Sequence, residues 1–121
     1  MSLSQGRRDL EISSRMVNQT WVIALKGSID ALTANEITSY TVEQFDDQGT
    51  QLVVDLSGVA FMSSAGLRAV LTVLKERRQR GGDLRLAAAQ PGVEKVLKIS
   101  GFTSIVKTYP TVESAVASFQ E

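Results

Sequence analysis

The chain contains no cysteine and no histidine among its 121 residues. Without cysteine there can be no disulfide bonds, no thiolate zinc sites and no cysteine nucleophiles. Without histidine there can be no histidine-based acid–base catalysis and no histidine-containing triads, and nearly all transition-metal sites are excluded. A metal-dependent hydrolase would need carboxylates alone, and the adjacent Asp46 and Asp47 are better interpreted as a solvated helix end. These absences remove most classes of enzyme.

An excess of charge of either sign and long apolar runs are also missing. Lys plus Arg and Asp plus Glu both number 13, so the formal net charge is zero. A neutral chain lacks the electrostatic footprint of a nucleic-acid-binding protein. The longest apolar runs, such as residues 21–25, are far too short to cross a bilayer, and the N-terminus lacks the apolar region of a signal peptide. We therefore expect a cytoplasmic protein without nucleic-acid binding or membrane insertion.

Size and composition predict one globular domain. The chain is 43% hydrophobic and 21% charged, as in ordinary soluble proteins, and its length suits a single core. The polar opening segment is typical of a frayed terminus. We expect one domain over residues 9–120 and a disordered leader over residues 1–8.

Hydrophobic patterning predicts the order of the elements. Residues 10–16 alternate apolar and polar, and residues 21–26 form a more buried strand, so the two predict an antiparallel hairpin turning at residues 17–20. Residues 33–36 form a capping box that starts a helix. Further strands are expected at residues 52–56, 84–88 and 105–109, and further helices after the serine pair at 63–64, from Pro91 and from about Val112. The order β-β-α-β-α-β-α-β-α predicts an α/β fold with a mainly parallel sheet covered by helices.

The helix after the serine pair ends in a basic cluster. Lys75, Arg77, Arg78 and Arg80 crowd its last turns, where cations suit the negative end of the helix dipole. A nucleic-acid patch is the alternative, but no aromatic residues interleave and the net charge is zero. We interpret the cluster as a solvated helix end.

Residues 53–67, which read VVDLSGVAFMSSAGL, carry the most chemical information. A strand bearing Asp55 is expected to end in a short loop with Gly58, and Ser63 and Ser64 then stand where an amphipathic helix begins. The positive end of a helix dipole favours anions, so a phosphate on a serine there would sit favourably, and Gly66 keeps backbone bulk low beside it. The alternative is that one of the serines simply caps the helix.

The same stretch resembles the signature of STAS domains, the family of bacterial anti-sigma-factor antagonists. The matching segments are residues 55–59 (DLSGV), 61–62 (FM) and 64–67 (SAGL). Upstream, residues 27–30 (GSID) resemble the Gly-x-Leu/Ile-Asp element that ends the second strand of the family. The resemblance covers about residues 9–119, and the two motifs together are much more specific than either alone. It implies a single STAS fold.

The resemblance also implies a function. Such a protein binds a kinase-type anti-sigma factor and releases a sigma factor, and phosphorylation of a serine at a helix start switches it off. By position Ser64 matches the phosphorylated serine, and Asp30, Ser57, Ser63, Ser64 and Gly66 would form the partner-binding surface. The implied partners are an anti-sigma-factor serine kinase and a serine phosphatase. Phosphorylated family members usually read Asp-Ser-Ser/Thr-Gly here, whereas this chain has Ser63 for the aspartate and Ala65 for the second hydroxyl residue.

Two alternative functions would use the same serine-bearing stretch or the same fold. STAS domains also serve without phosphorylation as adaptors in stress-signalling assemblies and in lipid or anion transport systems, and the loss of the aspartate at Ser63 favours that alternative. An enzyme with a serine nucleophile would need a Gly-x-Ser-x-Gly elbow and a base, but the pattern is absent, no histidine exists and nothing places a lysine nearby. Nucleotide-binding glycine motifs are absent as well. We therefore predict no enzyme, no catalytic or metal-binding residues and no cofactor.

Overall fold

The computed structural model describes residues 10–45 and 50–120, so the predicted leader over residues 1–8 and the Asp46–Asp47 pair lie outside the described residues. The described chain forms one five-stranded sheet with the strand order β1-β2-β3-β4-β5. β1 pairs antiparallel with β2, and every other neighbouring pair is parallel. The predicted α/β class, with a mainly parallel sheet and an antiparallel edge hairpin, is confirmed. The strands are β1 (Leu10–Val17), β2 (Thr20–Ile29), β3 (Gln51–Met62), β4 (Asp83–Ala87) and β5 (Thr108–Tyr109).

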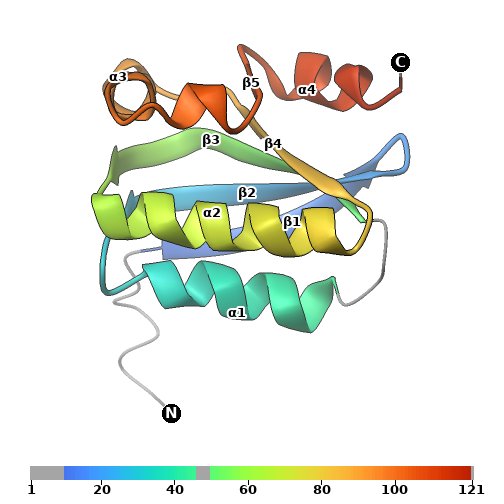
Figure 1. The fold of residues 1–121 in the computed structure, drawn as a ribbon, viewed down its shortest axis with the longest axis horizontal. Coiled ribbons are helices and arrows are strands. Elements are labelled where there is room, and N and C mark those ends of the chain that lie inside the picture. The colour runs from blue at the N-terminus through green and yellow to red at the C-terminus, as the bar shows by residue number, and fades with distance from the viewer. Residues whose placement is uncertain (1–9, 46–49, 121) are drawn as a thin grey trace.

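The described residues form four α-helices in the predicted order. They are α1 (Ala34–Gln44), α2 (Ser64–Gln79), α3 (Pro91–Ile99) and α4 (Val112–Ser118), with a 3₁₀ turn over Phe102–Ser104. α1 and α2 contact each other and lie side by side, and both begin at the same end of the sheet (Figure 1). This arrangement brings the loop before α1 and the start of α2 to one end of the molecule.

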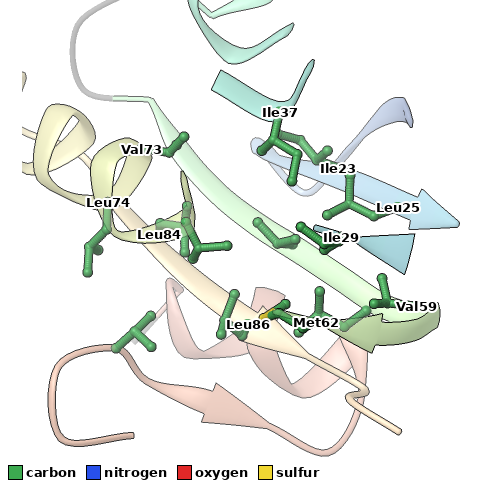
Figure 2. Close-up of a cluster of buried hydrophobic side chains, with 14 of the residues drawn as sticks. Ile23, Leu25, Ile29, Ile37, Val59, Met62, Val73, Leu74, Leu84 and Leu86 are labelled. Carbon is green, nitrogen blue, oxygen red and sulfur yellow. The ribbon is translucent and has the colours of Figure 1, made fainter. Parts of the chain in front are cut away.

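Two hydrophobic clusters hold the layers together. The larger joins side chains of β1 to β4 with side chains of α1, α2, α3 and the 3₁₀ turn. Figure 2 shows part of it, where Ile29, Met62 and Val59 from β2 and β3 lie among residues of the neighbouring elements. The smaller cluster lies beneath α4, where Ala115 and Val116 pack on Val22, Val53 and Ala87 of the sheet. Helices therefore cover both faces, as a parallel sheet requires.

The opening hairpin turns at the predicted position. Asn18 and Gln19 have φ angles of 49° and 69°, both in the left-handed region. Two central residues with positive φ give a turn whose twist matches that of the flanking strands. The hairpin register then pairs Val17 with Thr20 and runs to Leu10 opposite Gly27.

β3 is longer than predicted, and the expected loop containing Gly58 is wrong. β3 spans 12 residues and runs almost directly into α2. The β2–β3 register shifts between Ala24 and Lys26, which makes an irregularity opposite Gly58. A Cβ at Gly58 would lie 2.9 Å from the Leu25 carbonyl oxygen, so this glycine permits the close approach that keeps the strands paired.

Three further details of the structure differ from the predictions made from the sequence. Thr33 is the N-terminal flanking residue of α1, but its side chain makes no capping hydrogen bond, so the predicted capping box is wrong. The last strand is confined to Thr108–Tyr109, because the N–H groups of Ile105 and Val106 bond the Phe102 carbonyl oxygen and continue the turn that follows the 3₁₀ helix. The basic end of α2 is not uniformly solvated, since Arg77 is 1% exposed. Arg77 continues the buried stripe of Val70, Val73 and Leu74, which explains its burial.

Candidate functional site

The two sequence motifs meet at the carboxyl ends of β2 and β3. Ile29 and Met62 are the last residues of these strands and pair with each other. The residue that follows β3, Ser63, donates its backbone N–H to the Ile29 carbonyl oxygen at 2.8 Å. The resulting juxtaposition places Asp30, which follows Ile29, at the same edge of the sheet as the start of α2. Carboxyl ends of parallel strands are where open α/β sheets usually carry function.

Ser63 is the serine that caps α2. Its backbone is extended, with φ −91° and ψ 175°, and its side-chain oxygen accepts a hydrogen bond from the Gly66 N–H at 3.3 Å. Its carbonyl oxygen accepts the first helical hydrogen bond, from the Leu67 N–H at 3.0 Å. Ser63 is therefore the serine that caps the helix, and the Ser64 side chain takes no part in capping.

Ser64 is the first helical residue and is exposed. Within the described part of the chain its hydroxyl makes no hydrogen bond, so the group is free to react or to contact a partner. Negative charge is favoured at this position because the N–H groups of the first helical turn point out of the helix end. Chemically, the arrangement offers an accessible hydroxyl where an added anion is tolerated.

Gly66 acts through packing. It is buried, and a Cβ built on it would lie 2.6 Å from Ile29 Cγ2 and 3.1 Å from both the Ile29 carbonyl oxygen and Met62 Cγ. Only a residue without a side chain lets the first turn of α2 rest this closely on the ends of β2 and β3. Gly66 therefore sets the position of the two serines and does not itself present a surface.

Asp30 organises the loop between β2 and α1. Its Oδ1 accepts hydrogen bonds from the Leu32 N–H at 2.9 Å and the Thr33 N–H at 3.2 Å. The Thr33 hydroxyl accepts from the Asp30 N–H at 3.0 Å and donates to the Ser28 carbonyl oxygen at 2.9 Å. The Thr33 side chain, predicted from the sequence to cap α1, therefore stabilises the loop before that helix. This network holds Leu32 at the surface, where 80% of it is exposed.

Ser57 is exposed but lies away from Ser64. It belongs to the middle of β3, so the strand rise of about 3.3 Å per residue puts roughly 20 Å between it and Ser63. Its N–H donates to Asp55 Oδ1 at 2.9 Å, and its carbonyl oxygen accepts from Gln90 Nε2 at 2.8 Å. The structure therefore brings together Asp30, Ser63, Ser64 and Gly66, and places Ser57 beside the start of α3.

Two surface features at this end of the sheet were not predicted from the sequence: a pair of exposed apolar side chains and a groove of mixed polarity. Phe61, opposite Ser28 in the β2–β3 register, is 54% exposed, and together with Leu32 it gives this end of the sheet two exposed apolar side chains. A groove runs between α1 and α2, lined mainly by small and hydroxyl residues with one arginine: Ala31, Ala34, Asn35, Thr38, Ala65, Arg68, Ala69 and Thr72. Most apolar side chains are buried in the core, so the sequence alone does not show that Leu32 and Phe61 are exposed.

Among the described residues there is neither a cluster of metal-ligating side chains nor a helix that could span a membrane. No group of three or more Asp and Glu side chains there could hold a metal ion. None of the helices in residues 10–45 and 50–120 combines the length and apolar character needed to cross a membrane.

The comparisons with known proteins agree on one family. A family model described as the STAS domain matches residues 11–115. BtrV of Bordetella bronchiseptica, named as a candidate anti-sigma factor antagonist, is 32% identical over 111 residues, which cover 92% of this chain and 96% of that protein. The chain therefore belongs to the STAS family, and within it to the anti-sigma-factor antagonists. These relatives are named as regulators, in agreement with the prediction that the chain is not an enzyme.

Solved structures show the same fold. An anti-sigma factor antagonist from Mycobacterium paratuberculosis superposes with a TM-score of 0.83 at 22% identity, over 93% of this chain and 95% of its own. Unphosphorylated SpoIIAA, also an anti-sigma factor antagonist, gives a TM-score of 0.75 at 26% identity, over 91% of this chain and 96% of its own. The phosphorylated form of SpoIIAA, from Bacillus, gives 0.63 at 25% identity, over 90% and 99%.

Proposed function

We propose that this protein binds a kinase-type anti-sigma factor in the cytoplasm and thereby releases a sigma factor. The kinase would transfer the γ-phosphoryl group of ATP to the Ser64 hydroxyl and so end the interaction, and a serine phosphatase would reset the protein. The observation that carries this proposal is the exposed, unbonded hydroxyl of Ser64 on a rigid helix start. Asp30, Ser63 and Gly66 would shape the docking surface, with Ser57 as a more distant contact on β3.

The surroundings of Ser64 suit docking of a partner to the neutral form. Leu32 and Phe61 expose apolar surface at the same end of the sheet, and apolar side chains at the centre of an interface supply much of its binding energy. A phosphate on Ser64 would add about 1.5 to 2 negative charges to that surface. A new charge is costly to desolvate against a partner surface built for a hydroxyl, so docking would weaken.

The switch would not require unfolding. Ser63 already caps α2 and Gly66 already packs against Ile29, so neither contact uses the Ser64 side chain. A phosphate at the first helical residue is locally favourable. The existence of SpoIIAA in unphosphorylated and phosphorylated forms supports such a switch in a relative of the same fold.

The proposal is tested with a purified kinase-type anti-sigma factor that binds the unmodified protein. Incubation with that kinase and ATP, followed by mass spectrometry, should locate one phosphate on Ser64. Ser64→Ala should abolish the modification and keep binding, whereas Ser57→Ala, a change at another exposed serine, should leave the phosphate on Ser64. Modification confined to Ser57 or Ser63, or none by a kinase that binds the protein, would contradict the proposal. A partner that binds Ser64→Asp as tightly as the unmodified chain would instead indicate an adaptor of a stress-signalling or transport assembly.

A further inference from the structure

We propose that Arg68 binds the phosphate of phosphorylated Ser64 and holds it against α2. This inference rests on the proposed function, because it concerns the phosphorylated form of the same serine. Arg68 is exposed, and within the described residues its guanidinium makes neither a hydrogen bond nor an ion pair. The Ser64 hydroxyl is equally free. The unmodified protein thus carries a cation and a modifiable hydroxyl, both uncommitted, four residues apart on one helix.

Helix geometry brings these two side chains together. Residues four apart lie on one face of a helix with about 5–6 Å between their Cβ atoms. Each Cα–Cβ bond in a helix tilts toward the N-terminus, so the long side chain of Arg68 leans back over the turn that contains Ser64. A guanidinium can donate two parallel hydrogen bonds to phosphate oxygens, which suits this short reach.

The groove between α1 and α2 provides the space. Arg68 lines it together with Ala65 and Ala69, and small side chains leave room for a guanidinium to turn toward the helix start. Arg68 is the single charged side chain among the residues that line the groove, so within it no carboxylate competes for the cation. Asp30 lies at the same end of the sheet, but its Oδ1 accepts hydrogen bonds from its own loop.

The neighbouring Ser63 is uncharged and so does not compete with the phosphate for the Arg68 guanidinium. Its hydroxyl is occupied in capping α2 through the Gly66 N–H and brings no negative charge. An aspartate at that position would attract the same guanidinium. With serine there, Arg68 is left for the phosphate.

The test uses full-length protein with phosphoserine incorporated genetically at position 64, so it does not depend on the kinase. Phosphorus NMR titration measures the second pKa of the phosphate, which is near 6 in a free phosphoserine. A bound cation favours the dianion and lowers this pKa. We expect Arg68→Gln to raise it by about 0.3 pH unit, the size of an exposed i,i+4 ion pair, and Arg68→Lys to restore part of the difference.

Lys75→Gln is the matched control, because it removes one positive charge from an exposed position of the same helix. Eleven residues separate it from Ser64, which is about 16 Å and beyond the Debye length of about 10 Å at 0.1 M salt. Equal phosphate pKa values in Arg68→Gln and Lys75→Gln, with both variants folded, would overturn the inference. Failure of a kinase to modify Ser64 would count against the proposed function alone.

Discussion

Replacing Gly66 with alanine tests whether the first turn of α2 is positioned by contact with the sheet. The added Cβ would lie 2.6 Å from Ile29 Cγ2, well inside van der Waals contact, and 3.1 Å from the Ile29 carbonyl oxygen. Ile29 is completely buried, and its carbonyl oxygen accepts the hydrogen bond from the Ser63 N–H, so neither neighbour can yield cheaply. The start of α2 would have to move outward.

Two opposing terms set the magnitude. Overpacking of a core by one carbon typically costs about 1–3 kcal/mol, whereas alanine gains up to about 1 kcal/mol over glycine inside a helix. The central values, a cost of about 2 kcal/mol and a gain of about 1 kcal/mol, leave a net loss in the free energy of unfolding of about 1 kcal/mol. For a domain of this size that corresponds to a fall in Tm of about 4 °C.

Calorimetry or circular dichroism melts would measure this effect beside Gly92→Ala as the matched control. Gly92 lies in α3, and a Cβ there would meet nothing within 4 Å. The control should gain stability by about 0.4–1 kcal/mol, because only the entropic benefit of alanine remains. If Gly66→Ala is as stable as Gly92→Ala, the close packing of α2 on Ile29 is not what fixes the serine pair.

Three more predictions concern the same helix. Ser63→Ala should lower stability by about 0.5–2 kcal/mol through loss of the cap, measured by urea unfolding, while Ser63→Asp should keep the cap and bind an anti-sigma kinase more tightly in calorimetry. If Ser63→Ala unfolds at the same urea concentration as the unmodified chain, the Ser63 cap does not stabilise α2. Ser64→Asp should change Tm little and weaken that binding; a large drop in Tm would make Ser64 structural. Arg77→Ala should lower the free energy of unfolding by about 3 kcal/mol, and Arg77→Met should lower it by less, because methionine refills the buried volume. Equal losses for the two variants would show that the lost charge, and not the lost volume, causes the destabilisation.

The order of elements was predictable because it depends on local patterning. The amphipathic helix predicted after the serine pair is α2, with Val70, Val73 and Leu74 buried. The helix predicted from about Val112 is α4, which Thr111 caps by accepting from the Ser114 N–H at 3.0 Å. The hairpin was recognisable from the alternation over residues 10–16 and the apolar run over residues 21–26. Such signals arise within a few residues of the chain, so no tertiary knowledge is needed to read them.

The misread features depend on contacts between distant segments. Thr33 looks like a helix cap in sequence, but its hydroxyl is taken by the Ser28 carbonyl oxygen from β2. Gly58 looks like a turn residue, although it serves a strand irregularity against Leu25. Arg77 reads as one of several surface cations, and only its register with Val70 and Val73 reveals a buried position. In each case tertiary structure overrides a reasonable local preference.

The residues of the candidate site also differ in how well the sequence predicts their location. The family resemblance placed the motifs at residues 27–30 and 64–67 on one surface. The hydrogen bond from the Ser63 N–H to the Ile29 carbonyl oxygen brings the ends of their strands together. Ser57 shares the motif of Ser64 but not its location, because the intervening residues remain extended in β3. Proximity in sequence is thus a poor guide to proximity in space along a strand.

The serine at position 63 separates two roles that an aspartate would combine. An aspartate before the modified serine could cap α2 and could also place a negative charge beside the phosphate. The structure shows that Ser63 performs the capping, through its hydrogen bond from the Gly66 N–H, so the helix start keeps its geometry. What this chain lacks is only the charge. If Ser64 is phosphorylated as we propose, the phosphate would meet no fixed anion at position 63 and an uncommitted cation, Arg68, four residues further along α2.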